Sequence, residues 1–198
     1  MNWYEDEVKE LEKIHLTIAY EPETLFYGSS SIRMWTTLYD DFQNINPVNL
    51  GFGGSTLAAC VWFFERIMLP YQPKRLVLYA GDNDLGDGRN PEEVLIFFQQ
   101  MVVKAAQRFG NIPCYFVSLK SSPSRWNIVN QFVRANMLIE NEIHKNTSNW
   151  KFINVYNEML DHSGHPQKKY FSSDELHLSN KGYKLWTQII SKKITHNP

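Results

Sequence analysis

The chain has 198 residues and a mass of 23.2 kDa, and its 20 basic and 21 acidic residues give a formal net charge of −1. This length is typical of one domain that buries its core without disulfide or metal crosslinks. Hydrophobic residues make up 43% and charged residues 21%, which excludes a disordered or collagen-like chain. The balanced charge argues against a nucleic-acid-binding protein, which would carry a basic stripe. Aromatic residues are abundant, at 14%, which indicates either a Trp-rich core or an aromatic-lined cleft.

Targeting signals are not evident in the sequence. No apolar run reaches the about 18 residues that a membrane span needs. The N-terminal segment is acidic and amphipathic and lacks the features of a secretory signal. We therefore expect a cytoplasmic protein, or a secreted or periplasmic one if a signal peptide has been removed. Cys60 and Cys114 lie in apolar contexts without metal-ligand spacing, so both are expected to be buried and reduced.

Five short apolar runs are the candidate strands. They have four to six residues each, and a glycine directly follows the first three of them. Short β-rich runs closed by turn residues are typical of buried parallel strands. The runs are Thr24–Tyr27, Pro47–Leu50, Arg75–Ala80, Cys114–Leu119 and Lys151–Val155.

Helical patterns precede and separate these runs. The clearest start is Asn90, a favoured N-cap residue, with Pro91 at the first helical position and two glutamates in the first turn. The predicted helices are Trp3–His15, Thr56–Leu69, Pro91–Phe109, Trp126–His144 and Asn180–Ile194. This alternation predicts an α/β domain, a three-layer α/β/α sandwich with a flavodoxin-like parallel sheet of order 2-1-3-4-5. We expect one domain over residues 1–198, with residues 1–20 as a helical extension packed on it.

Chemistry-bearing residues follow the first strand, where open α/β sheets bind ligands. Gly28 is followed by the three serines at positions 29–31. Three interpretations stay open: a turn with an N-cap, a phosphate cradle at a helix N-terminus, or a nucleophile held at the end of the strand.

The next two strands are also followed by polar or flexible segments. Residues 49–56 contain three glycines in four positions, which can aim backbone N–H groups into a site. The segment Gly81–Asp84 places Asn83 between two acids. It could hold a cation, form an Asx-turn, or donate the Asn83 amide to an oxyanion.

A histidine close to the C-terminus is the candidate base. His177 follows Asp174 by three residues in a loop, so the carboxylate can hold the ring while the other nitrogen faces outward. A capping or surface pair is the competing interpretation. His162 and His165 lack a third well-spaced ligand, so the sequence predicts no metal site, and no cofactor is expected.

Taken together, the four segments resemble the SGNH, or GDSL-type, hydrolase family, which supplies Ser, Gly, Asn and His from four separated blocks in this order. The resemblance spans about residues 25–186 and is carried by Ser30, Gly54, Asn83 and the Asp174–His177 pair. It implies that Ser30, His177 and Asp174 are catalytic, and that Ser30, Gly54 and Asn83 form the oxyanion hole. It also implies the α/β/α fold and no cofactor.

The chain departs from the family pattern at two positions. The first block usually reads Gly-Asp-Ser, whereas Ser29 stands in place of the acid here. The second block usually continues with Asp after its glycine, whereas this chain has Ser55. Both changes remove an acid near the expected site, and the three adjacent serines make the choice of nucleophile less direct.

The resemblance implies a serine esterase or acylhydrolase. Small acyl esters, acetyl above all, are the expected substrates, with carbohydrate esters among them; a lysophospholipase or thioesterase of the same family is the alternative. A flavodoxin-like phosphate- or nucleotide-binding protein and a non-catalytic carbohydrate-binding domain are the alternatives from other classes. The expected partner is a small-molecule ester, without nucleic acid or a membrane span, and the oligomeric state is not readable from the sequence.

Three residues are the candidate substrate contacts. Arg125 and Trp126 follow the fourth strand at the same edge of the sheet, and Trp35 lies one helical turn after the serines. Each tryptophan could equally pack in the core. Trp62 and Trp186 fall within predicted helices and are expected to be core residues.

Overall fold

A computed structural model of the protein describes residues 1–146 and 149–195, so five positions included in the predicted domain lie outside the described residues. Its centre is a parallel sheet with the order β2-β1-β3-β4-β5, which confirms the predicted topology. The strand ends differ from the prediction by one or two residues. The strands are β1 (Thr24–Gly28), β2 (Pro47–Gly51), β3 (Arg75–Tyr79), β4 (Cys114–Val117) and β5 (Trp150–Ile153).

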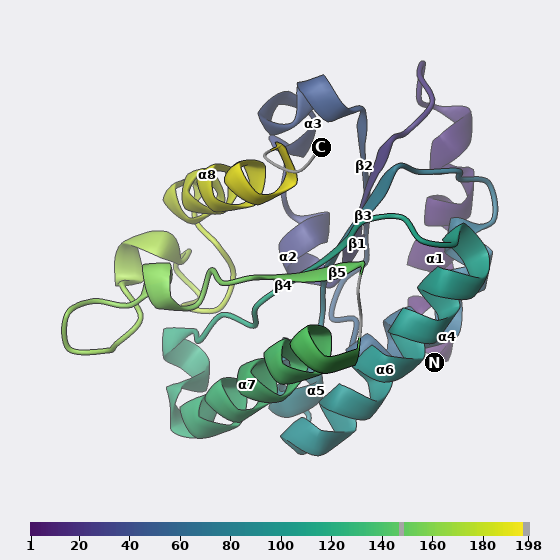
Figure 1. The fold of residues 1–198 in the computed structure, drawn as a ribbon. Coiled ribbons are helices and arrows are strands. Elements are labelled where there is room, and N and C mark those ends of the chain that lie inside the picture. The colour runs from purple at the N-terminus through teal and green to yellow at the C-terminus, as the bar shows by residue number, and fades with distance from the viewer. Residues whose placement is uncertain (147–148, 196–198) are drawn as a thin grey trace.

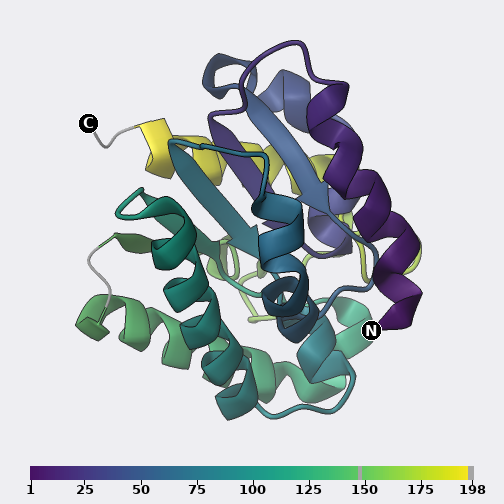
Figure 2. The same ribbon diagram turned by 90° about the vertical axis from the view of Figure 1, so that its right-hand side faces the viewer.

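Helices cover both faces of the sheet, as Figures 1 and 2 show. Helices α1, α4, α6 and α7 lie on one face, while α2, α3 and α8 lie on the other (Figure 1). The α-helices are α1 (Glu5–Lys13), α2 (Ser30–Arg33), α3 (Leu38–Asp41), α4 (Leu57–Met68), α5 (Asp82–Gly86), α6 (Pro91–Phe109), α7 (Val129–Asn146) and α8 (Asn180–Thr195). The arrangement is the predicted three-layer sandwich.

Local signals set the ends of two helices. At the start of α6, the Asn90 side chain accepts a hydrogen bond from the Glu93 N–H, and the Glu93 carboxylate accepts one from the Asn90 N–H, each 2.9 Å long. This capping box confirms the predicted start. Helix α7 was predicted to begin at Trp126, but a 3-10 helix, Pro123–Ile128, precedes it and α7 begins at Val129.

Helix α1 is fixed to the rest of the molecule. Val8 and Leu11 are buried against the core, and Arg66 of α4 pairs with Glu5 and Glu12 at 2.8 and 2.7 Å. The observed α-helix is shorter than the predicted helix Trp3–His15. A single 3-10 turn flanks it on each side, Asn2–Tyr4 before it and Ile14–Leu16 after it.

The aromatic excess is largely a property of the core. Trp35 is only 1% exposed, and its ring contacts Phe26, Phe42, Tyr183 and Trp186. The substrate-binding role predicted for Trp35 is therefore wrong, because its side chain packs inward under α8.

Trp62 and Trp186, both predicted to be core residues on helices, differ in their exposure. Trp186 is fully buried, as expected, whereas Trp62 is 68% exposed, so its predicted place in the core is wrong. Trp62 shares its helix face with Glu65 and Arg66, three and four positions later, and all three side chains are exposed, so this polar pair marks the face of α4 that is turned to solvent.

Both cysteines are buried and free, which confirms the expectation from their apolar contexts. Burial raises the pKa of the Cys114 thiol to about 12.

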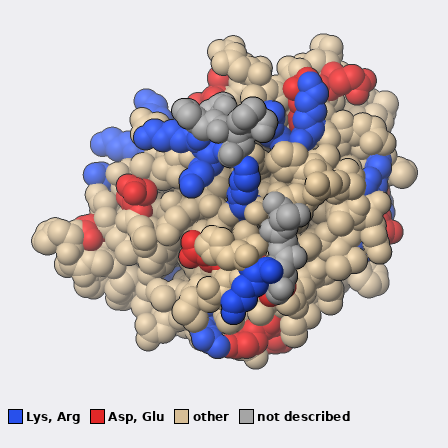
Figure 3. All heavy atoms as spheres, viewed as in Figure 1, with Lys and Arg blue, Asp and Glu red and all other residues tan. Residues whose placement is uncertain are grey.

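Within the described residues, none of the helices combines the length and apolar character that a bilayer crossing requires. Lysine and arginine side chains gather around α8 on the face shown in Figure 3.

Candidate active site

The carboxyl ends of β1, β2 and β3 meet at one edge of the sheet. Gly28 pairs in register with Gly51 on one side and Tyr79 on the other. A Cβ at Gly28 would lie 1.8 Å from the Tyr79 carbonyl oxygen, and its φ of 144° is one that other residues rarely adopt. Only glycine fits here, and the sharp turn that it permits starts α2 at Ser30.

Ser30, His177 and Asp174 lie in one hydrogen-bonded row. The Ser30 Oγ is 3.1 Å from His177 Nε2, and His177 Nδ1 is 2.6 Å from Asp174 Oδ2. Residues 147 positions apart are thus joined by the loop that leads into α8. Such a row can activate a hydroxyl, since the imidazole accepts its proton while the carboxylate orients the ring.

The loop that carries this pair is held by its own hydrogen bonds. Asp174 Oδ1 accepts hydrogen bonds from the Leu176 and His177 N–H groups and from the Ser172 hydroxyl. The left-handed backbone of Glu175, with φ 56°, allows the carboxylate to reach these donors. Desolvation opposes ionisation, but the hydrogen bonds from His177, Ser172 and the backbone outweigh it and lower the pKa of Asp174 well below its usual range.

The three adjacent serines have different surroundings. The Ser29 hydroxyl is fully buried and faces Asp82 Oδ1 at 3.5 Å. Ser31 is also buried, and its backbone carbonyl accepts a hydrogen bond from Tyr183. Among these three, the hydrogen bond to His177 is made by Ser30. The geometry therefore favours Ser30 as the reactive hydroxyl.

Three donors predicted for an oxyanion lie on the loops around Ser30. In the described part of the chain, neither the Ser30 N–H nor the Gly54 N–H donates a hydrogen bond within the protein. The Asn83 amide donates one hydrogen to the Ser55 carbonyl at 3.0 Å, which leaves its second hydrogen for a ligand. Gly54 has a left-handed φ of 64°, which suits glycine.

Ser55, at a departure from the family pattern, ties two of these loops together. Its hydroxyl donates to the Gly28 carbonyl at 3.1 Å, and its own carbonyl accepts the Asn83 amide. A neutral serine thus connects the first, second and third loops of the site.

A buried ion pair lies beneath Asn83. Lys120 Nζ is 3.2 Å from Asp82 Oδ2, and the Tyr79 hydroxyl donates to the same oxygen at 3.2 Å. Burial opposes ionisation of Asp82, yet Lys120 and Arg125 prevail and hold its pKa below the usual value. Asp82 is therefore satisfied by protein cations and does not act as part of a cation site. Lys120 was not among the predicted site residues, and its one signal in the sequence is a charged residue directly after the apolar run 114–119.

Arg125 lies at the site but contacts protein groups. Its guanidinium donates to the Asn83 Oδ1 at 2.9 Å and to the Asp82 carbonyl at 2.8 Å. These bonds fix which way the Asn83 amide points, because Arg125 can donate only to the amide oxygen. Arg125 thus contacts a predicted oxyanion donor, and its contact with the substrate stays a prediction.

Trp126 is half-buried next to Arg125, and its ring lies against His165, with centroids 4.7 Å apart. His165 is used in this contact and in a hydrogen bond with Ser163. Over residues 1–146 and 149–195, no group of three or more His, Cys, Asp or Glu side chains could hold a metal ion.

Asp84, at the same edge of the sheet, holds the start of α4 in place. Its carboxylate is fully buried and accepts the Leu57 N–H at 2.6 Å, at the start of α4. Burial raises the pKa of Asp84 to about 6, although the backbone N–H bonds and Arg89 act in the opposite direction.

This raised pKa predicts a pH-dependent stability. Between about pH 4, the unfolded value, and about pH 6, the folded protein holds the Asp84 proton more tightly than the unfolded chain does. The contribution of Asp84 to the free energy of unfolding should therefore fall as the pH rises through this window, by at most about 3 kcal/mol. Above about pH 6 this contribution should no longer change with pH. Urea unfolding of the native protein and Asp84→Asn from pH 4 to 7 measures the difference. A stability difference that stays constant with pH would contradict the prediction.

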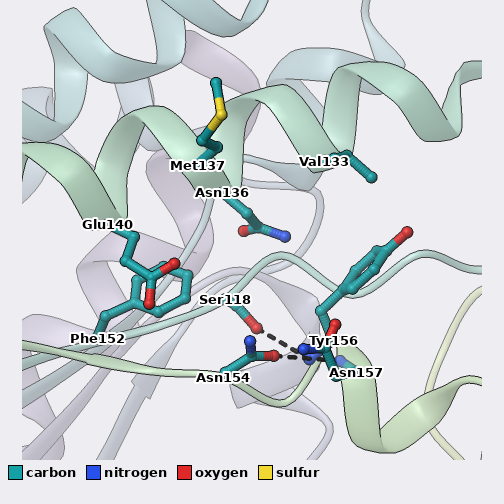
Figure 4. A pocket seen from close by; sticks show the side chains of 9 residues that line it. All are labelled: Ser118, Val133, Asn136, Met137, Glu140, Phe152, Asn154, Tyr156 and Asn157. Atoms are coloured by element: carbon teal, nitrogen blue, oxygen red, sulfur yellow. Dashed lines mark hydrogen bonds between the residues drawn. The ribbon is translucent and has the colours of Figure 1, made fainter.

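A pocket of about 210 Å³ lies away from Ser30, between α7 and the end of β5 (Figure 4). The side chains of Ser118 and Asn136, which line it, form hydrogen bonds to the backbone. Ser118 accepts the Val155 and Tyr156 N–H groups, and the Asn136 amide bonds both the N–H and the carbonyl of Leu119. These bonds fix the end of β4, directly before Lys120.

Comparisons with solved structures find the same fold in several proteins. A lipolytic protein of the G-D-S-L family from Veillonella parvula has a TM-score of 0.75 at 17% identity, covering 88% of this chain and 99% of that chain. A GDSL-like lipase from Bacteroides thetaiotaomicron has a TM-score of 0.79 at 20% identity, covering 95% and 97%. An acetyl esterase, solved as a serine-to-alanine mutant with an acetate ion, has a TM-score of 0.71 at 11% identity, covering 87% and 96%.

The TM-scores of 0.71 to 0.79 show that the chain shares its fold with these proteins. A comparison with curated proteins found no match. The family model described as the GDSL-like Lipase/Acylhydrolase family matches residues 17–185, which include every block of the site from Ser30 to His177. The chain therefore belongs to the GDSL-like lipase/acylhydrolase family.

Proposed function

We propose that the chain acts, as a single domain, as a serine esterase that cleaves carboxylic esters with small acyl groups. The observation that carries the proposal is the row of Ser30, His177 and Asp174, with separations of 3.1 and 2.6 Å. A structural serine has no need of an imidazole and a carboxylate in series. This arrangement has the chemistry of nucleophilic catalysis.

The reaction begins with attack of the Ser30 Oγ on the ester carbonyl carbon, while His177 Nε2 takes the hydroxyl proton. Asp174 holds the ring and stabilises the imidazolium. The negative charge that develops on the carbonyl oxygen is stabilised by the Ser30 and Gly54 N–H groups and the Asn83 amide.

The second half restores the serine. Collapse of the tetrahedral intermediate expels the alcohol, which takes the proton from His177, and leaves an acyl group on Ser30. His177 then takes a proton from a water as that water attacks the acyl carbon. The second tetrahedral intermediate collapses with cleavage of the bond to Ser30 Oγ, which takes the proton back from His177, and the carboxylic acid departs. His177 accepts or donates the proton in each step, so the side chains of the protein carry out every proton transfer of the cycle.

Small acyl groups are the proposed substrates for a structural reason. The loops that follow the first three strands are short: Ser29 alone joins β1 to α2, residues 52–56 join β2 to α4, and residues 80–81 join β3 to α5. Loops of this length offer little apolar surface to cover a long acyl chain. The fold shared with an acetyl esterase supports the same choice. The half-buried Trp126 supplies an aromatic surface next to the site, which favours a sugar as the alcohol part.

Labelling with a fluorophosphonate tests this proposal. We expect one phosphonyl adduct per chain, and peptide mapping should place it on Ser30. Ser30→Ala should abolish the adduct, whereas Ser29→Ala and Ser31→Ala should keep it. A series of p-nitrophenyl esters from acetate to palmitate should be cleaved with kcat/KM falling as the chain lengthens. No adduct, or one outside Ser30, would contradict the mechanism, and a preference for palmitate would contradict the proposed preference for small acyl groups.

A further inference from the structure

The glycine loop that carries the Gly54 N–H is held from outside the four sequence blocks. The Tyr4 hydroxyl donates to the Gly54 carbonyl at 3.0 Å, and the Gly53 N–H donates to Glu7 Oε2 at 2.8 Å. Tyr4 directly precedes α1 and Glu7 lies in its first turn. The N-terminal segment thus makes two hydrogen bonds to two successive residues of the loop.

The two bonds lie on either side of one peptide group. The Gly54 N–H belongs to the peptide that joins Gly53 to Gly54. Glu7 fixes the peptide before it through the Gly53 N–H, and Tyr4 fixes the peptide after it through the Gly54 carbonyl. Two successive glycines would otherwise leave this peptide free to rotate, because glycine has the widest choice of backbone conformations.

Both side chains are themselves held in place. The Tyr4 ring is 6% exposed and packs edge-on against Phe52 and Phe63, with centroids 5.4 and 6.3 Å away. Helix α1 is fixed to α4 through the ion pairs of Arg66 described above. The direction of the Gly54 N–H is therefore tied to the packing of α1 on α4.

We propose that Tyr4 and Glu7 are positioning residues for the Gly54 oxyanion donor, so that the N-terminal segment is a working part of the active site. This inference rests on the proposed esterase function. Neither residue needs to contact the substrate, since both act through the backbone of the loop. Loss of either bond should lower the rate of acyl transfer more than it lowers substrate binding, because an oxyanion donor acts chiefly in the transition state.

The test compares Tyr4→Phe and Glu7→Ala with the native protein on p-nitrophenyl acetate. Each variant should lower kcat by about 5- to 50-fold, a part of the 10²–10³ that one oxyanion donor is worth, with KM within about twofold. Glu7→Gln keeps an acceptor for the Gly53 N–H and should restore most of kcat, although it loses the ion pair with Arg33. Hydrogen exchange of residues 52–56 should be faster in Tyr4→Phe and Glu7→Ala, which reports on the loop without catalysis.

Tyr71→Phe is the matched control. It also removes a buried tyrosine hydroxyl, but one with no hydrogen-bond partner in the described part of the chain. Its kcat and loop exchange should equal those of the native protein. If Tyr4→Phe and Glu7→Ala match this control while Ser30→Ala is inactive, the positioning role is overturned and the esterase function stands. If the native protein neither labels at Ser30 nor cleaves any ester, the esterase function fails, and the inference built on it fails as well.

Discussion

Ser30→Ala is expected to lower kcat/KM for p-nitrophenyl acetate by roughly 10⁴–10⁶-fold, the range found when a nucleophile is removed from a serine hydrolase. The Ser30 Oγ is the atom that would form the acyl bond, and it lies 3.1 Å from the nitrogen that would accept its proton. Alanine keeps the backbone N–H of residue 30, so the oxyanion hole remains. The loss should therefore appear in kcat, measured by release of p-nitrophenol, with KM little changed.

His177→Ala should lower kcat/KM by about as much as Ser30→Ala, and the losses caused by the two substitutions should not add up in the double variant. Nucleophile and base act as one unit, so Ser30→Ala/His177→Ala should be no slower than Ser30→Ala alone. Additive losses would indicate that the two side chains act in separate steps.

Ser31→Ala is the control for damage to this turn. The Tyr183 hydroxyl donates to the backbone carbonyl of residue 31, and alanine keeps that acceptor. We expect activity within about threefold of the native value, since the Ser31 side chain is buried away from His177. Equal losses in Ser30→Ala and Ser31→Ala would point to general disruption of α2 and would contradict the assignment of Ser30.

The sheet was predictable because its strands are buried on both faces. Runs such as Arg75–Tyr79 and Cys114–Val117 are almost wholly apolar, so their positions follow from composition alone. The parallel topology then places their carboxyl ends at one edge, which is why Asn83 could be expected near Ser30 without any contact information.

Most of the contacts that were not predicted have one physical cause. The burial of Trp35 rests on Tyr183 and Trp186, which lie 148 and 151 positions further along the chain. The contacts of Lys120 with Asp82 and of Tyr4 with Gly54 join residues 38 and 50 positions apart. No local periodicity records such pairs, because they arise when loops from different layers meet.

The second large effect is expected at Asn83. Asn83→Ala should lower kcat by roughly 10²–10³-fold, the usual worth of one oxyanion donor, while KM changes by a few fold at most. The Asn83 Nδ2 is already directed by two bonds, from Arg125 to the amide oxygen and from Nδ2 to the Ser55 carbonyl. Its remaining hydrogen therefore needs no reorganisation when negative charge develops on the substrate.

Asn83→Asp separates the amide hydrogen from the shape of the side chain. Aspartate keeps the acceptor for Arg125 but donates no hydrogen bond and brings a negative charge toward the oxyanion, so it should be at least as slow as Asn83→Ala. Fluorophosphonate titration of both variants counts the Ser30 hydroxyls that still react, which separates slow turnover from unfolded protein. A loss below about threefold in Asn83→Ala would remove Asn83 from the oxyanion hole. The charge would then have to be stabilised by the Ser30 and Gly54 N–H groups alone, and the orientation of the amide by Arg125 would serve the fold of the loop instead of the reaction.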